Sequence, residues 1–199
     1  MHLFEPSLII KTAGLLGVYL IIFIESGLLF GFFLPGDTLL FSAGIFAAQG
    51  YFSIQTLIIG SMVAAIIGDN LGYFLGKKIG PKLNNKKDSF FFSKSKINKA
   101  EVFYKKYGAL AVIIARFVPI MRTFTPFVAG IVRMHYRKFL FYNILGGMLW
   151  TTGVSLLGYY LGSKINNPDR FIFPIILFVI VSSFLPILFE FTKKYFKKH

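Results

Sequence analysis

The sequence predicts an all-α integral membrane protein, an inverted repeat with two opposed re-entrant helical hairpins plus transmembrane helices. Three observations lead to this fold class. Hydrophobic residues make up 55% of the 199 residues, which is too many for an ordinary soluble domain. Several apolar runs approach or exceed the roughly 20 residues that cross a hydrocarbon core. Two segments of the chain also repeat each other. We therefore expect a single membrane domain over residues 1–199.

The apolar runs follow one another with few charges inside them. The first contains one lysine and one glutamate, the second contains one aspartate, and the last two contain no charged residue. Each run is long enough to enter or cross a bilayer. The four runs are Leu8–Phe33, Ile54–Gly76, Phe139–Gly162 and Phe171–Phe189.

The positive charges indicate how these runs cross the membrane. The net charge is +14, and ten lysines lie between Gly76 and Tyr107. The charge sits in loops between apolar runs, so it indicates topology and no nucleic-acid partner. The positive-inside rule places this lysine-rich loop and the lysine-rich tail after Phe189 in the cytoplasm, and the weakly charged loop 163–170 outside. We therefore expect a multi-pass protein with a cytoplasmic C-terminus.

An internal repeat relates the two halves of the chain. Residues 43–79 and 129–165 align without a gap, with 13 of 37 positions identical, including four glycines in each copy. The charge rule gives the two copies opposite directions, which is the arrangement of many secondary transporters. We place repeat one at about 9–80, a basic linker at 81–106, repeat two at about 107–165 and a last span at 171–191.

A broken apolar segment precedes the main span of each repeat, at 25–44 and 115–130. The arms around each break are too short to span a bilayer, and proline and glycine interrupt backbone hydrogen bonding. Irregular backbone at membrane depth is tolerated where it lines a cavity, so both segments are interpreted as re-entrant hairpins. The residues expected to break them are Pro35, Gly36, Pro119 and Pro126.

Two segments allow alternative interpretations. Residues 93–106 fit a basic amphipathic helix on the cytoplasmic membrane surface, and the alternative is a solvated loop. If residues 8–24 form a full span, the N-terminus is cytoplasmic, and if they only lead into the first hairpin, it lies outside.

Four ionisable residues inside the apolar segments are the main functional candidates: Glu25 and Asp37 in the first broken segment, Arg116 and Arg122 in the second. If the hairpins meet near the midplane, two carboxylates face two guanidiniums. Guanidinium binds phosphate or carboxylate in a bidentate fork, so the arginines are candidate ligands for an anionic head group. The carboxylates are candidate proton carriers. The alternative is a static ion-pair cluster that only holds the hairpins.

Three further polar residues are candidates for lining the same cavity. Asp69 lies beside glycines spaced four apart, which form a helix-packing face or part of the cavity. Asn143 and Trp150 either hydrogen-bond across helices or line the cavity. The histidines lack metal-ligand spacing, and nucleotide and nucleophile motifs are absent. We therefore expect no metal, no cofactor and no enzymatic activity.

The order and spacing of these residues resemble the DedA family, also called the SNARE-associated or VTT-domain family. The resemblance covers about residues 20–165 and includes Glu25, Pro35-Gly36-Asp37, Gly68-Asp69, Arg116 with Pro119 and Arg122, and Asn143 with Trp150. It implies a bacterial inner-membrane protein with two opposed re-entrant hairpins, and recycling of undecaprenyl phosphate as its function. It also implies that the two acids and two arginines, Glu25, Asp37, Arg116 and Arg122, are the functional residues.

Several functions compete on this basis. The first is a proton-coupled flippase for an anionic lipid, either undecaprenyl phosphate or a phospholipid. The second is a proton-coupled antiporter of small ions or drugs that uses the same carboxylates. The third is a membrane-embedded enzyme such as a lipid phosphatase, and the fourth is a non-transporting assembly or integrity factor. A homo-oligomer is compatible with each of them.

Overall fold

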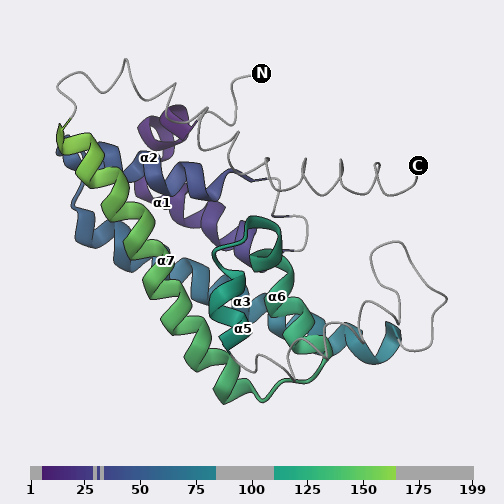
Figure 1. Cartoon of the computed structure of the whole chain (residues 1–199). Coiled ribbons are helices and arrows are strands. Elements are labelled where there is room, and N and C mark those ends of the chain that lie inside the picture. The colour runs from purple at the N-terminus through teal and green to yellow at the C-terminus, as the bar shows by residue number, and fades with distance from the viewer. Residues whose placement is uncertain (1–5, 29–30, 32–33, 84–109, 165–199) are drawn as a thin grey trace, which may run out of the picture.

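The computed structural model describes residues 6–28, 31, 34–83 and 110–164, and this part of the chain is built from helices and turns. Along the chain the helices are α1 (Pro6–Gly27), α2 (Gly36–Ala48), α3 (Ile54–Leu83), α5 (Leu110–Ala115), α6 (Pro119–Ile131) and α7 (Tyr136–Lys164) (Figure 1). The predicted surface helix at 93–106 and the predicted last span at 171–191 lie outside the described residues.

Two long helices form the frame of the fold. The apolar parts of α3 and α7, Ile54–Gly80 and Tyr136–Lys164, are long enough to cross a membrane. They include the runs 54–76 and 139–162 that the sequence predicts as spans, so the prediction of an all-helical protein with membrane-length helices is confirmed. The two helices run in opposite directions across the molecule (Figure 1), as the charge rule requires of the two repeats.

The first broken segment separates α1 from α2. The helix α1 has a kink at Gly14, where φ is +58°, and the apolar part Ala13–Gly27 starts at this kink. The chain leaves helical geometry after Gly27 and resumes it at Gly36, directly after Pro35. Proline has no backbone N–H, so it is well suited to a helix start, where that donor has no partner in the helix. The arm after the break, α2, has 13 residues and is shorter than a span.

The second broken segment separates the six-residue helix α5 from α6. Pro119 is the first residue of α6, so it marks the helix start as expected. Pro126, which the sequence assigned as a hairpin breaker, instead lies inside α6, and the helix continues through it to Ile131. Neighbouring helices can support a proline inside a membrane helix, and here α3 packs against it, because the space beside Gly72 is filled by the Pro126 ring.

The two halves pack crosswise, α2 against α7 and α6 against α3. Glycines at equivalent positions of the repeat make these contacts close. Gly44 of α2 lies against the α7 backbone at Ser155–Tyr159, and Gly130 of α6 lies against the α3 backbone at Tyr73–Lys77. The short helix of each half therefore rests on the long helix of the other half.

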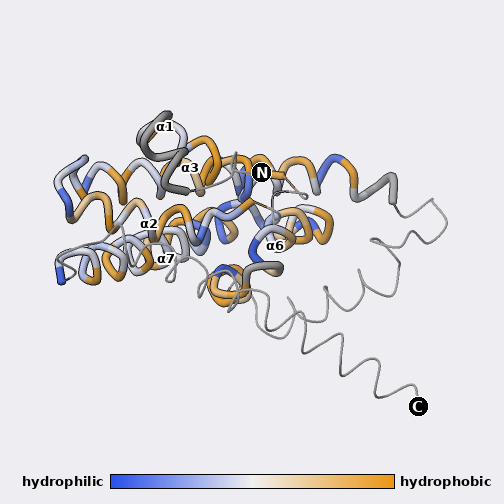
Figure 2. The backbone as a smooth tube through the Cα atoms, turned by 90° about the horizontal axis from the view of Figure 1, so that it is seen from above, coloured by the Kyte–Doolittle hydropathy of each residue, from blue (hydrophilic) through white to orange (hydrophobic). Residues whose placement is uncertain are grey.

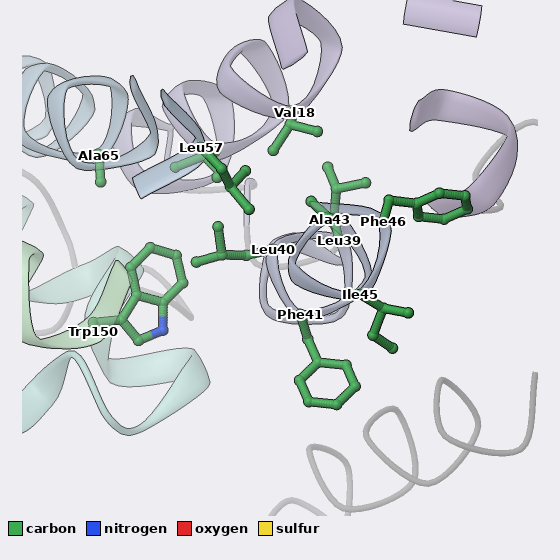
Figure 3. Close-up of a cluster of buried hydrophobic side chains, with 11 residues drawn as sticks. Val18, Leu39, Leu40, Phe41, Ala43, Ile45, Phe46, Leu57, Ala65 and Trp150 are labelled. Atoms are coloured by element: carbon green, nitrogen blue, oxygen red, sulfur yellow. The ribbon is translucent and has the colours of Figure 1, made fainter. Parts of the chain in front are cut away.

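The largest buried apolar cluster lies where α1, α2 and α3 meet α7. Val18 projects from α1 and Leu57 from α3, and Leu40 of α2 extends toward the indole ring of Trp150 (Figure 3). Leu40 lies within one turn of Asp37, so this core fixes the start of α2 relative to α7. A second cluster around Tyr73 fixes the turn between α6 and α7, because the Tyr73 hydroxyl donates to the Met134 carbonyl at 2.5 Å.

The outer faces of the helices also carry exposed apolar side chains, and hydrophobic residues recur along the helices (Figure 2). On α3 an exposed stripe repeats every four residues through Ile59, Val63, Ile67 and Leu71. A soluble monomer rarely exposes so continuous an apolar patch. Hydrocarbon surroundings account for it, because lipid chains solvate apolar side chains without cost.

Replacing Gly44 with alanine is expected to destabilise the fold. The added methyl group would lie 3.0 Å from the Tyr159 nitrogen and 3.2 Å from the Gly158 carbonyl carbon, and backbone atoms cannot rotate away. We expect Gly44→Ala to cost about 2 kcal/mol. Gly153→Ala is the matched control, because nothing lies within 4 Å of its added methyl group, and it should gain up to about 1 kcal/mol. Thermal unfolding in detergent measures the stability of both variants. Equal changes in their unfolding temperatures would contradict this packing.

Candidate functional site

The two helix breaks meet at a cluster of buried polar side chains, which we call the Arg122 cluster: Glu25, Asp37, Arg122 and Trp150. One terminal nitrogen of Arg122 donates to Asp37 Oδ1 at 2.5 Å and the other donates to Glu25 Oε1. The guanidinium carbon also lies 4.5 Å from the centre of the Trp150 ring. The indole nitrogen of Trp150 donates to the same Asp37 oxygen at 2.8 Å. One arginine therefore joins two carboxylates and an aromatic face.

Each member of the Arg122 cluster comes from a different helix. Glu25 lies at the C-terminal end of α1, and Asp37 lies in the first turn of α2. Arg122 lies in the first turn of α6, and Trp150 lies in the middle of α7. The two helix breaks are thus required for the cluster, because they bring a helix end and two helix starts to one point beside a continuous helix.

Gly36 has a second role besides breaking the helix. A Cβ atom at this position would overlap the carboxylate of Glu25. A residue with a side chain would therefore push Glu25 away from the start of α2. The Pro35-Gly36-Asp37 stretch thus starts the helix, leaves space for one acid and supplies the other.

The members of the cluster differ in exposure. The side chains of Arg122 and Glu25 are each 5% exposed, whereas that of Asp37 is 26% exposed. Trp150 is buried. Asp37 is thus the member of the cluster that is most accessible from the surroundings.

A second group, the Arg116 cluster, consists of Asp69, Arg116 and Asn143. A terminal nitrogen of Arg116 donates to Asp69 Oδ2 and, at 2.5 Å, to Asn143 Oδ1. The Asn143 amide in turn lies 3.4 Å from the Ile66 carbonyl as a donor. All three members are buried. The cluster ties the second helix break to both long helices, since Asp69 belongs to α3 and Asn143 to α7.

Two glycines of α7 make room for the Arg116 side chain. A Cβ atom at Gly146 would lie 3.0 Å from Arg116 Cδ, and one at Gly147 would lie 3.5 Å from its terminal nitrogen Nη1. A bulkier residue at either position would compete with the guanidinium for space. These glycines therefore allow a charged side chain to lie flat against α7.

The two clusters contain every acidic residue in the part of the chain that the structure describes: Glu25, Asp37 and Asp69. Three carboxylates face two guanidiniums, so the negative groups outnumber the positive ones by one. Several buried polar atoms also have no hydrogen-bond partner, namely Glu25 Oε2 and the Nε atoms of Arg116 and Arg122. A purely structural network is stable only when its members are well paired and hydrogen-bonded. The unmatched negative charge leaves capacity for a proton, and the unpaired Nε donors leave capacity for a further hydrogen-bond acceptor.

The structure brings together the residues that the sequence singled out, in a pairing that the sequence did not predict. Two carboxylates were expected to face two arginines; instead Glu25 and Asp37 share Arg122, and Arg116 pairs with Asp69. Asp69, weighed in the sequence as either a packing or a cavity residue, is thus an ion-pair partner. Sequence reasoning missed Gly147, whereas the neighbouring Gly146 is one of the four aligned glycines of the second repeat and belongs to the family resemblance.

Replacing Asp69 with asparagine is expected to destabilise the chain by about 3 kcal/mol, because the buried Arg116 charge would lose its balancing carboxylate. The double variant Asp69→Asn with Arg116→Gln removes both charges, so it should cost clearly less than the sum of the two single changes. Unfolding in detergent measures the three variants. Additive costs would mean that the two side chains do not depend on each other.

The chain is similar in sequence to known membrane proteins. Residues 34–160 match the model of the VTT domain, and this range contains α3, all but the last four residues of α7, and both clusters except Glu25. The chain is 40% identical to Protein DedA of Escherichia coli over 175 residues, which cover 87% of this chain and 80% of that protein.

Two other relatives cover similar parts of the chain. An uncharacterized membrane protein of Mycobacterium tuberculosis is 42% identical over 186 residues, covering 92% of this chain and 81% of the relative. Inner membrane protein YqjA of Escherichia coli is 32% identical over 145 residues, covering 73% of this chain and 66% of that protein. No solved structure matches the chain.

Proposed function

Because the chain belongs to the VTT-domain (DedA) family of membrane proteins, we propose that it is a flippase. It moves an anionic lipid carrier, undecaprenyl phosphate, across the bacterial inner membrane, and the movement is coupled to protons. The observation that carries this proposal is the position of Arg122, a buried guanidinium held between Glu25 and Asp37 where the two helix breaks meet.

The broken helices support a transport role. In this proposal α1 with α2, and α5 with α6, are re-entrant hairpins that enter from opposite sides. The arms that follow the two breaks, α2 and α6, have 13 residues each and are too short to span. Secondary transporters with inverted repeats bind substrate at such breaks, near the midplane. The crosswise packing of α2 on α7 and α6 on α3 fits two related halves.

The chemistry of the Arg122 cluster supports an anionic headgroup as substrate. Guanidinium forms its strongest hydrogen bonds with phosphate and carboxylate oxygens. In the cluster Arg122 already binds carboxylate oxygens, so a phosphate oxygen is a direct competitor for the same donors. The lipid tails remain outside, in the hydrocarbon that the apolar outer faces of the helices require.

Charge balance supports proton coupling. When a phosphate binds Arg122, a carboxylate loses its counter-charge inside a low-dielectric site. Adding one proton to that carboxyl group offsets one unit of the negative charge that the phosphate brings, and the proton leaves when the headgroup is released and the ion pair re-forms. Glu25 and Asp37 are the groups in place for this exchange, since both contact Arg122.

The proposed orientation of the chain rests on its exposed cations. Lys77 and Lys78 at the end of α3 and Arg133, Arg137 and Lys138 near the start of α7 are exposed at the same end of the molecule. The positive-inside rule assigns this end to the cytoplasm, and the C-terminus is assigned to the same side.

A headgroup-accessibility assay tests the proposal. Liposomes containing undecaprenyl phosphate and the purified chain receive an impermeant phosphatase, which hydrolyses only headgroups in the outer leaflet. With an active flippase, phosphate release should proceed well beyond the outer-leaflet half, and an imposed pH gradient should change its rate. Release that stops at half, as in protein-free liposomes, would contradict the proposal. Phosphate release without added phosphatase would favour a membrane enzyme instead.

A further inference from the structure

Trp150 occupies a special place among the residues that contact Arg122. Its indole N–H donates to Asp37 Oδ1 at 2.8 Å, and its ring lies under the guanidinium at 4.5 Å. The indole therefore binds both partners of one ion pair at once. It is also the only tryptophan of the chain.

Asp37 Oδ1 is an acceptor shared by two donors. Arg122 Nη1 lies 2.5 Å from it on one side and the Trp150 nitrogen lies 2.8 Å from it on the other. Glu25 contacts Arg122 through the other terminal nitrogen and contacts no indole among the hydrogen bonds of the described residues. If Arg122 releases both acids, Asp37 still has the side-chain donor of Trp150, whereas Glu25 has only the backbone N–H of Gly36.

The exposure of the two acids indicates which of them an incoming headgroup reaches first. A headgroup that approaches from the surroundings meets Asp37 first, because its side chain is 26% exposed and that of Glu25 is 5% exposed. The Arg122 donor bound to Asp37 is therefore the one within reach of an incoming phosphate. The guanidinium stays in place during the exchange, because it keeps Glu25 and the face of the indole ring.

We propose that Trp150 is a positioning residue that retains Asp37 when an anionic headgroup takes its place on Arg122. Asp37 is then the exchangeable partner of Arg122, and Glu25 is the lasting one. This inference rests on the proposed function, since it assumes that a phosphate binds at Arg122, and it identifies which of the two contacts the phosphate replaces.

A thermodynamic cycle tests this role. The probe is dodecyl phosphate, a single-chain phosphate monoester, titrated calorimetrically into the chain in neutral maltoside micelles, with dodecanol as the uncharged control. Trp150→Phe keeps a ring beside Arg122 and removes the N–H donor. In the bound state of this variant Asp37 has lost both donors, so the Kd should rise about tenfold, the size expected for a hydrogen bond to a charged group.

The same change is then made in a chain that carries Asp37→Asn. The asparagine side chain is an uncharged acceptor, and losing a hydrogen bond to an uncharged acceptor costs less than losing one to a carboxylate. Trp150→Phe should therefore raise the Kd by at most about threefold in the Asp37→Asn background. Equal shifts in both backgrounds, or no shift in either, would show that Trp150 only fills space. Tyr160→Phe, an aromatic change on the exposed face of the same helix, controls for general effects on α7.

The unmodified chain supplies a spectroscopic measurement. Because Trp150 is the sole tryptophan, its emission reports on this site alone. Dodecyl phosphate should shift the emission saturably, and dodecanol should not. A shift in the unmodified chain combined with equal Kd changes in the cycle would overturn the role of Trp150 and leave the anion site standing. If dodecyl phosphate neither binds nor shifts the emission, the anion site itself is wrong, and the role of Trp150 falls with it.

Discussion

Arg122→Lys is expected to reduce lipid translocation at least about tenfold at equal protein, although the positive charge is kept. Arg122 places one terminal nitrogen on Asp37 and the other on Glu25 and lies flat against Trp150. The lysine ammonium is a single point charge without the planar fork, so it cannot hold Glu25 through one nitrogen while a second nitrogen exchanges Asp37 for a phosphate.

The headgroup-accessibility assay measures this loss, and a second variant serves as its control. Arg137→Lys makes the same chemical change at an exposed position at the start of α7, and it should keep a rate close to that of the unmodified chain. If Arg122→Lys also keeps that rate, the site requires only a positive charge, and the proposal that the guanidinium binds Glu25 and the headgroup at the same time is excluded.

Asp37→Asn is expected to abolish the response of translocation to an imposed pH gradient. Asparagine has nearly the same shape, so it can still accept hydrogen bonds from Arg122 and Trp150. It cannot take up and release a proton in the physiological range, so an exchange that depends on this carboxyl group stops. Charge counting also favours a folded variant, because the two clusters together then hold two carboxylates and two guanidiniums.

Two measurements made together separate a coupling role of Asp37 from a structural one. One is the thermal unfolding of Asp37→Asn in detergent, and the other is its translocation rate with and without a gradient. Retained stability, with exchange that no longer responds to the gradient, is the expected result. A collapse of stability together with the rate would make Asp37 a scaffold residue, and an unchanged gradient response would direct attention to Glu25.

The sequence predicted the long helices well, because the signal for a span is local. A run of apolar residues has one low-energy arrangement in a bilayer, so α3 begins at the predicted residue Ile54 and α7 begins within a few residues of Phe139. The signal for the helix start at Gly36 was equally local, since Pro35 and Gly36 act on the backbone beside them. Pro126 was misassigned because its effect depends on support from α3, which is a tertiary contact.

The sequence also predicted which residues form the site, but it did not predict which acid pairs with which arginine. Any charged side chain in an apolar segment is costly, so Glu25, Asp37, Asp69, Arg116 and Arg122 were evident as candidates. Which acid meets which arginine depends on how the helices cross, and the spacing along the chain contains no such information. A count of three acids against two arginines shows in advance that one arginine must serve two carboxylates or that one acid stays unpaired.

The most direct test is a structure of the chain in lipid nanodiscs that contain saturating undecaprenyl phosphate. We expect the phosphate to lie between the two helix breaks, with an oxygen at about 2.8 Å from a terminal nitrogen of Arg122. Asp37 should have left that nitrogen and kept its contact with the indole of Trp150. A structure in which Arg122 retains both carboxylates while the phosphate lies elsewhere would contradict the account.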